Sequence, residues 1–351
     1  MTEREPRIIQ GRYLEDILAQ PVALESTLRE MQDLPQGLTA IREHLQDGRL
    51  KRVVLTGMGS SFYSLTPLFL TLTNYGYQVV QVETSELIYY LPRLLHRDSL
   101  MVAVSQSGRG AEILRLLKLV AHQATLLAVT NTPRSPLAQA ADAVVLTRAG
   151  EEFSVSSKTY VCTLAVVELI AGFLCDEQHD SVHQELLAAV PYAASYLESW
   201  QEHVLELAPH LQGMEHLFFV GRGASLAAAG TGSLITKESV GVHAEALSSA
   251  AFRHGPMEIL RENTLVGVLE GASATRDLNQ KLRRDVSHSP AKAFLIGYHG
   301  ALASLRIASS SPRILPILEV LPFEMMTLAL AYLSSIEAGV FQRGTKVTVT
   351  E

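Results

Sequence analysis

The sequence contains little charge, little cysteine and no concentrated block of basic residues, and each shortage excludes a class of protein. Charged residues account for 19% of the 351 positions, and the net charge is −7. A nucleic-acid partner is therefore not expected, because proteins that bind nucleic acids usually present a basic patch. Backbone dipoles and hydroxyl groups, rather than a basic field, would have to hold an anionic ligand.

Signals for export and for membrane insertion are also missing from the sequence. The N-terminal segment MTEREPRIIQ is charged and lacks the apolar core of a signal peptide. No apolar run is expected to reach the roughly 20 residues that cross a bilayer. Cys162 and Cys175 lie in an apolar helical stretch without the spacing of metal ligands, so we expect buried free thiols in a reducing compartment. These features predict a soluble cytoplasmic protein with no membrane partner, no metal and no cofactor.

Apolar residues, by contrast, are abundant at 47% of the chain, which is enough for sizeable cores. Residues 12–49 carry them at helical spacing, with Pro21 as a predicted break. The predicted strands that follow are RVVLTGMGSS, YQVVQVETSEL, LMVAVSQSG, ATLLAVTNTP and AVVLTRAGEE, and the predicted helices between and after them are FYSLTPLFLTLTNYG, AEILRLLKLVAHQ and SSKTYVCTLAVVELIAGFL. This alternation is typical of a mostly parallel sheet with helices on both faces.

The same pattern restarts after a helical region at about residues 182–212. The segment HLFFVGRGASLAAAGTGSLITKESV has the same form as RVVLTGMGSSFYSLTPLFLTL, and Gly221 follows Gly57 by 164 residues. An internal repeat of one α/β unit accounts for this similarity. The second copy continues with TLVGVLEG, AKAFLIGYHG and a final apolar helix around residues 319–338.

Two loops that follow predicted strands carry glycine and hydroxyl side chains. The segments Gly57–Ser61 and Ser105–Gly108 lie where parallel sheets bind ligands, beyond the carboxyl ends of strands. A helix is predicted after each loop, and a helix N-terminus favours an anion. Ser-Gln-Ser-Gly is thus a candidate phosphate cradle without lysine, and a purely structural N-cap is the alternative. Dinucleotide binding is disfavoured, because Phe62 stands at the third glycine position of G-x-G-x-x-G.

An ordered set of short motifs resembles one known family over nearly the whole chain. The motifs are GMGSSFYS, SQSG, LTRAGEE followed by SSKTY, GRGAS, KESVGVHAEALSS, RHGPMEIL and KVTVTE. Their order and spacing resemble the sugar isomerase (SIS) family, in particular the isomerase half of glucosamine-6-phosphate synthase. Stand-alone SIS-type glucosamine-6-phosphate deaminases and fructosamine-6-phosphate deglycases share the pattern.

This resemblance implies an α/β fold of two tandem SIS domains, each a mostly parallel, doubly wound, flavodoxin-like sheet flanked by helices. We accordingly predict an N-terminal helical segment at 1–35, SIS domains at 36–200 and 201–340, and a tail at 341–351 that folds over the active site. The resemblance also implies which residues bind the sugar phosphate. These are Ser61, Ser105, Gln106 and Ser107 at the phosphate and Ser156 at the sugar hydroxyls.

Three further positions match the catalytic residues of the family. Glu238 would move a proton between C1 and C2, a task that suits a carboxylate with a raised pKa. His254 would open the sugar ring, reaching in from the neighbouring subunit of a homodimer with a shared active site. Lys346 would form a Schiff base with the ketose, which requires a folded tail and a neutral amine. Without the resemblance, each of these would be an ordinary surface charge, with Lys237 as a salt-bridge partner for Glu238.

Two positions depart from the family pattern. Gly110 stands where the family often has a phosphate-binding threonine, and Ile235 stands where the synthase has a second lysine. Loss of that lysine removes a positive charge near Lys346, which would raise the pKa of the Lys346 amine. An isoleucine adds desolvation, which would lower the same pKa. These departures favour the alternative of a sugar-phosphate-binding regulatory protein that has lost catalysis.

The combined pattern predicts a phosphosugar aldose–ketose isomerase and deaminase that converts glucosamine 6-phosphate to fructose 6-phosphate and ammonia. A fructosamine-6-phosphate deglycase is the alternative enzyme. Because the chain begins at the linker, we expect no glutaminase domain and therefore no release of ammonia from glutamine. The expected partner is a small-molecule sugar phosphate.

Overall fold

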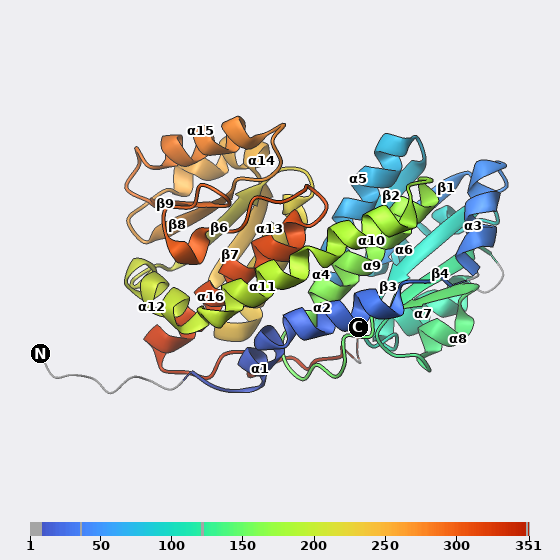
Figure 1. The fold of residues 1–351 in the computed structure, drawn as a ribbon, viewed down its shortest axis with the longest axis horizontal. Coiled ribbons are helices and arrows are strands. Elements are labelled where there is room, and N and C mark those ends of the chain that lie inside the picture. The colour runs from blue at the N-terminus through green and yellow to red at the C-terminus, as the bar shows by residue number, and fades with distance from the viewer. Residues whose placement is uncertain (1–8, 36, 121–122, 349, 351) are drawn as a thin grey trace, which may run out of the picture. The chain divides into compact units, whose positions relative to one another are not determined.

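The computed structural model describes residues 9–35, 37–120, 123–348 and 350, which fold into two compact units (Figure 1). The β1–β5 unit comprises the described residues of Val22–Glu151, Lys158–Ala188 and Gly344–Glu351. The β6–β9 unit comprises those of Met1–Pro21, Glu152–Ser157 and Ala189–Arg343. Each unit therefore collects segments that are distant in sequence. The predicted boundaries at residues 35, 200 and 340 stay predictions.

The β1–β5 unit contains a five-stranded sheet in which every neighbouring pair is parallel. Its strands are β1 (Arg52–Gly57), β2 (Gln78–Glu83), β3 (Ser99–Val104), β4 (Thr125–Thr130) and β5 (Ala143–Leu146). They lie in the order β2-β1-β3-β4-β5, which is the flavodoxin-like order. All five strands were predicted, and the doubly wound parallel fold is confirmed.

Helices of the β1–β5 unit differ from the sequence prediction in several places. They are α2 (Gln20–Glu30), α3 (Gly37–Gln46), α4 (Ser60–Tyr63), α5 (Thr66–Tyr75), α6 (Thr84–Tyr89), α7 (Ala111–Val120), α8 (Pro136–Ala140), α9 (Lys158–Leu174) and α10 (His179–Leu187), with a 3-10 turn at Pro92–Leu94. The helices Thr84–Tyr89 and Pro136–Ala140 were not predicted, and the first of them corrects the end of the strand predicted at 77–87. The single helix predicted at 62–76 is divided into α4 and α5. The predicted helix 111–123 extends over two positions, 121 and 122, that lie outside the described residues. Pro21 does mark a break, because α2 starts at Gln20 with the proline in its first turn.

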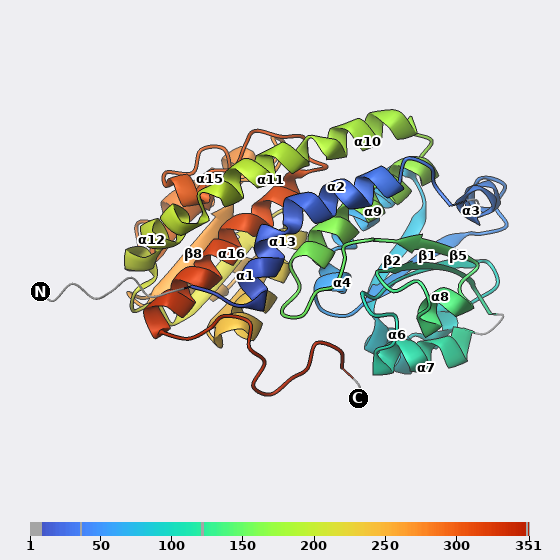
Figure 2. The same ribbon diagram turned by 60° about the horizontal axis from the view of Figure 1, so that its bottom comes forward.

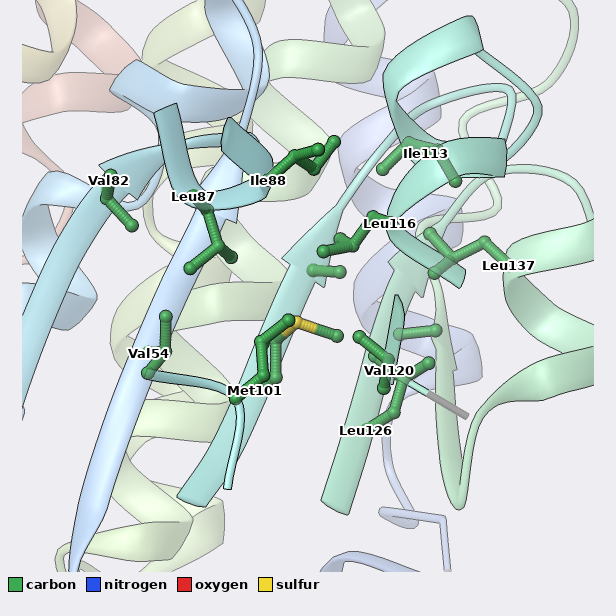
Figure 3. Packing of buried hydrophobic residues seen from close by; sticks show 13 residues of the cluster. Val54, Val82, Leu87, Ile88, Met101, Ile113, Leu116, Val120, Leu126 and Leu137 are labelled. Atoms are coloured by element: carbon green, nitrogen blue, oxygen red, sulfur yellow. The ribbon is translucent and has the colours of Figure 1, made fainter. Parts of the chain in front are cut away.

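Apolar side chains between the sheet and two helices form a core of this unit. Leu87 and Ile88 of α6 and Ile113 and Leu116 of α7 pack over strands that carry Val54 and Met101 (Figure 3). Each fully buried side chain of this size contributes about 1.5–3 kcal/mol through the hydrophobic effect. The helices are thereby fixed on the sheet, and the loops at the ends of the strands are held in place. Cys162 in α9 and Cys175 directly after it are both buried, as predicted.

The β6–β9 unit repeats the topology with four strands. These are β6 (His216–Gly221), β7 (His243–Ser248), β8 (Thr264–Leu269) and β9 (Lys292–Ile296), all parallel, in the order β7-β6-β8-β9. The internal repeat is confirmed, because β1 and β6 span equivalent positions with the offset of 164 residues between Arg52 and His216. Strand β7 was not predicted, although the same offset applied to β2 places a strand there.

The helices of the β6–β9 unit cover this second sheet. They are α1 (Arg12–Leu18), α11 (Ala189–Glu198), α12 (Trp200–Leu211), α13 (Ser225–Val240), α14 (Ser249–Arg253), α15 (Arg276–Val286) and α16 (Leu315–Ser334), with 3-10 turns at Pro256–Ile259 and Ala303–Leu305. Helices α13 and α16 run side by side (Figures 1 and 2). A Cβ at Gly232 would lie 2.5 Å from the Phe323 ring, so glycine is required for this close approach.

Helix α16 corrects one expectation from the sequence. It is 20 residues long and apolar enough, by length and composition, to cross a membrane. Its most apolar window is 83% buried inside the protein, as in the core helix of a globular fold. Two glutamates, Glu319 and Glu324, interrupt the run and are fully buried as well.

Candidate functional site

The predicted phosphate cradle is a tight loop between β3 and α7. The N–H of Ser105 donates to the Val129 carbonyl at 3.0 Å, which continues the pairing of β3 with β4. The N–H of Gly108 donates to Ser105 Oγ at 3.2 Å and closes the turn. Gly108 has φ +60, and a Cβ there would meet Ser135 Oγ at 2.3 Å. Glycine is therefore required at this position, and the three side chains before it are held half-buried at the sheet edge.

The loop after β4 supports the cradle through the backbone of Gln106. The Gln106 carbonyl accepts from the N–H of Asn131 at 3.0 Å and from the hydroxyls of Thr130 at 3.1 Å and Thr132 at 3.4 Å. Three donors on one carbonyl fix its orientation. Sequence reasoning missed these supporting residues, although the TNTP segment after a predicted strand offered a signal.

Ser61 lies at the same edge of the same sheet as the cradle. Strands β1 and β3 are neighbours, with Thr56 opposite Ala103, so the loops that follow them emerge side by side. A Cβ at Gly57 would lie 3.0 Å from the Ser61 backbone and 3.1 Å from the Val104 carbonyl. Glycine thus allows the β1 loop to approach the end of β3. Ser61 therefore lies at the same sheet edge as Ser105, Gln106 and Ser107, and a shared role in phosphate binding stays a prediction.

The C-terminal tail contacts this same loop region within the β1–β5 unit. The N–H of Ala111, the first residue of α7, donates to the Thr348 carbonyl at 3.1 Å. Gly110 lies beside that contact, and a Cβ there would make an ordinary van der Waals contact of 3.8 Å with the same oxygen. Lys346, two residues earlier, is half-buried. The β-prone tail forms no strand among its described residues, yet it is ordered beside the cradle's helix.

Glu238 lies on α13 in the β6–β9 unit, half-buried beside a group of acidic residues. The Tyr13 hydroxyl lies near these carboxylates and accepts a hydrogen bond from the Thr327 hydroxyl at 3.3 Å. Burial, and then the nearby carboxylates of Glu324, Glu238 and Glu152, raise the pKa of Tyr13 well above its ordinary value. Tyr13 therefore stays protonated near neutral pH and can donate a hydrogen bond among these carboxyls.

Ser156 belongs to a loop, Glu152–Ser157, that is fixed within the β6–β9 unit. The buried carboxylate of Glu152 accepts from the N–H of Ser157 at 3.0 Å, which closes the loop around Ser156. The Ser154 hydroxyl donates to the Gly339 carbonyl at 2.6 Å. The N–H of Gly339 in turn donates to the Ser239 carbonyl at 2.9 Å. Gly339 therefore links the loop of Ser156 to the end of α13 that carries Glu238.

His254 follows α14 and is exposed in this chain. The Ser248 hydroxyl caps α14 by accepting from the Ala251 N–H at 3.0 Å, and Gly255 with φ +122 turns the chain after the histidine. Ile235, at the position of the missing lysine, is fully buried in α13. The Ser248 cap and the turn at Gly255 set the backbone around His254.

The candidate residues are thus divided between the two units. Ser61, Ser105, Gln106, Ser107 and Lys346 belong to the β1–β5 unit, whereas Ser156, Glu238 and His254 belong to the β6–β9 unit. A single site that contains all of them stays a prediction. Among the described residues, no group of three or more His, Cys, Asp or Glu side chains is arranged to hold a metal ion.

Comparison with known proteins identifies a domain family and similar proteins. Residues 49–171 match the SIS domain family. The chain is 31% identical over 342 residues to a glutamine–fructose-6-phosphate aminotransferase (isomerizing) from Pyrobaculum aerophilum, covering 93% of this chain and 54% of that protein. The chain thus spans about half the length of this relative.

Solved structures show the same fold along nearly the full chain. The C-terminal domain of glucosamine-fructose-6-phosphate aminotransferase from Francisella tularensis superposes with a TM-score of 0.82 at 22% identity, covering 95% of this chain and 98% of that one. Glucosamine-6-phosphate deaminase from Thermotoga maritima gives 0.79 at 16% identity, covering 97% and 100%. The family match at residues 49–171 and the two parallel sheets of related order give the chain the fold of two tandem SIS domains.

Proposed function

We propose that this protein is a cytoplasmic phosphosugar isomerase and deaminase that converts glucosamine 6-phosphate and water to fructose 6-phosphate and ammonia. The observation that carries the proposal is the contact between the tail and α7. It holds the segment of Lys346 beside the helix that follows the Ser-Gln-Ser-Gly loop. A phosphate-binding loop and an amine in one unit are the two parts that a sugar-phosphate Schiff base requires.

The phosphate would be bound by hydroxyl and amide groups rather than by cations. Ser61 and Ser107 supply hydroxyl donors at the sheet edge, and the supported Gln106 supplies a side-chain amide. Hydrogen bonds to a charged group contribute about 1.5–3 kcal/mol each. Because the cradle carries no lysine, binding would depend on its shape, and this agrees with the extensive support from the β4 loop.

The chemical steps follow from the remaining residues. His254 would transfer the proton that opens the ring. Glu238 would remove the proton from C2 and return it to C1, which leaves an imine at C2. Lys346 Nζ would attack that carbon and displace ammonia, and water would then hydrolyse the lysine imine to release fructose 6-phosphate. The exposure of His254 supports a homodimer in which this residue serves the partner's site.

A panel of phosphorylated sugars tests this function. Pure protein should release ammonia from glucosamine 6-phosphate in amounts equal to the fructose 6-phosphate formed. Turnover of a fructosamine 6-phosphate without ammonia release from any hexosamine 6-phosphate would favour the deglycase. Incubation with fructose 6-phosphate in deuterated water separates both from a regulatory protein, because an isomerase exchanges the proton at C1 and a sensor binds without exchange.

A further inference from the structure

A cavity of about 90 Å³ lies at the carboxyl edge of the second sheet, apart from the groups discussed above. It is formed within the β6–β9 unit by the loops that follow β8 and β9 and by the start of α16. Its polar walls include Glu270, Arg276, Tyr298, Ser310 and Glu319. Ligands of open parallel sheets bind at this edge.

Glu319 is the unusual member of this wall. It is fully buried; its Oε1 accepts from the Ser225 hydroxyl at 2.9 Å, while Oε2 has no hydrogen-bond partner among the described residues. Burial raises the pKa of Glu319 to about 8, so the carboxyl retains its proton near neutral pH. A buried polar atom without a partner destabilises the fold, and a ligand that donates or accepts a hydrogen bond in the cavity would remove that cost.

Charges around the cavity nearly cancel. Glu270 is 2% exposed on its side chain, and Arg276 Nε lies 3.5 Å from its Oε1. Burial alone would raise the pKa of Glu270, but hydrogen bonds from the backbone and ring of His299 and from Gln280 outweigh it and lower that pKa. An ionised Glu270, a cationic Arg276 and a protonated Glu319 leave little net charge. An anionic ligand would face the Glu270 carboxylate, and a cationic ligand would face the Arg276 guanidinium.

Because the chain contains an internal repeat, the loop after β8 can be compared directly with the phosphate cradle after β3. Strand β8 occupies the position in its sheet that β3 occupies in the other. The segment after β3 is Ser105–Gly108, whereas the segment after β8 is Glu270–Ser273, with a carboxylate in place of a hydroxyl. Ser310 Oγ, a second buried atom without a partner in the described part of the chain, also lines the cavity. The equivalent place in the second domain is therefore built for hydroxyl groups and not for phosphate.

We propose that this cavity binds adjacent hydroxyl groups along one edge of a neutral sugar. The Glu319 carboxyl and the Arg276 guanidinium donate to the sugar oxygens, and Glu270 and the Ser310 hydroxyl accept from the sugar hydroxyls. Its size admits one edge of a ring and not a whole sugar phosphate. The site is distinct from the cradle after β3 and does not depend on the proposed reaction.

Methyl α-D-glucopyranoside is a suitable probe, because it has no phosphate and its ring cannot open. Binding to the full chain is measured by saturation-transfer NMR. Arg276→Ala, at the rim, and Glu319→Leu should each weaken binding at least about tenfold, the equivalent of one hydrogen bond to a charged or buried group. Glu319→Gln retains one donor and one acceptor and should keep most of the affinity. Ser105→Ala, in the other unit, is the matched control and should bind the glucoside like the parent.

Two results would overturn this assignment. One is the absence of glucoside binding to the parent protein. The other is binding that survives both Arg276→Ala and Glu319→Leu; if it is also lost in Ser105→Ala, the sugar lies at the phosphate cradle. Arg276→Ala keeps the test valid if Glu319→Leu does not fold, since the arginine side chain is 38% exposed.

Discussion

The N–H of Ala111 donates a 3.1 Å hydrogen bond to the carbonyl of Thr348, which joins the chain's tail to the first residue of α7. One donor at the start of this helix is therefore used by the protein itself. A phosphate at the preceding loop would rely on the other N–H groups and on the serine and glutamine side chains. Phosphate binding and tail position are coupled by this arrangement, because both use the same helix end.

Lys346 should be required for turnover and not for stability. Lys346→Met, and a chain ending at Gly344, should lose nearly all ammonia release while the unfolding midpoint changes little. Borohydride should trap fructose 6-phosphate covalently on the parent protein and not on Lys346→Met. Lys281→Met, on α15 in the other unit, is the control and should be trapped like the parent. Full activity in either tail variant would remove Lys346 from the mechanism.

The cradle serines should contribute to binding of the phosphate group. Ser105→Ala and Ser107→Ala should each weaken the binding of a sugar phosphate by about 1.5–3 kcal/mol, or roughly 10- to 150-fold in the dissociation constant. Ser105→Ala should have the larger effect, because its hydroxyl also accepts from the Gly108 N–H and closes the loop. Titration calorimetry measures both, with the exposed Ser287→Ala as control. Unchanged affinity in both variants would show that the loop does not bind phosphate.

A shared active site should be detectable by mixing inactive chains. Glu238→Gln and His254→Ala should each be inactive alone. If His254 serves the partner's site, a mixed dimer holds one site with both residues, and mixing should restore part of the ammonia release. Mass spectrometry of the mixture verifies subunit exchange. Exchange without recovered activity would mean that each site is built within one chain.

Stability of the β6–β9 unit should depend on pH through Glu324. Burial raises its pKa to about 8 from an ordinary value of 4.5, opposed by the hydrogen bond from Gln20. The folded state therefore binds more protons than the unfolded state between these values, so this contribution is complete below pH 4.5 and is lost as pH rises toward 8. The slope is at most about 1.4 kcal/mol per pH unit.

Glu324→Gln isolates this effect. Its stability relative to the parent should increase steadily from pH 5 to pH 8, whereas the exposed Glu262→Gln should show a constant difference. The single tryptophan, Trp200 on α12, belongs to the β6–β9 unit, so urea unfolding followed by its fluorescence reports this unit. A difference between Glu324→Gln and the parent that does not vary with pH would mean that Glu324 is not titrating abnormally.

Gly339 should tolerate no side chain. It has φ +79, and a Cβ would lie 2.3 Å from Ser154 Oγ and 2.6 Å from Tyr13 Cβ. Gly339→Ala should destabilise the unit by about 2–4 kcal/mol through backbone strain plus displacement of the Glu152–Ser157 loop. Gly213→Ala separates the two causes, because Gly213 has φ +78 with no atom within 4 Å. Equal losses in the two variants would argue against the steric contact.

The sequence predicted the architecture well because strong local patterns set it. Five β-rich segments ending in small residues correspond to β1–β5, and the Gly57 and Gly221 offset located β6. Strand β7 was missed because its sequence HAEALS lacks the β-branched and aromatic residues that are typical of strands. The split of the helix predicted at 62–76 falls at Leu65, which is fully buried, and no local pattern indicates a break there.

The candidate site was predictable only in part, for a physical reason. Side chains that contact a ligand come from short motifs, and a resemblance can identify these. The residues that fix the loop shape are set by long-range hydrogen bonds, such as those from Thr130 and Thr132 to the Gln106 carbonyl. Gly339 is hydrogen-bonded to Ser154, 185 residues before it, and to Ser239, 100 residues before it. No local sequence pattern indicates either bond.

The two glutamates inside α16 have a consequence before folding is complete. In the unfolded chain their carboxyls have ordinary pKa values and are ionised at neutral pH. A charged side chain at the centre of a bilayer costs about 2.5–3.5 kcal/mol, so Glu324 at the middle of the 20-residue segment opposes insertion of the nascent chain, and Glu319 nearer its start adds a smaller penalty. Once α16 is enclosed, burial raises both pKa values and the charges are neutralised by proton uptake. The same helix thus resists lipid while it is being made and becomes an uncharged core element when folded.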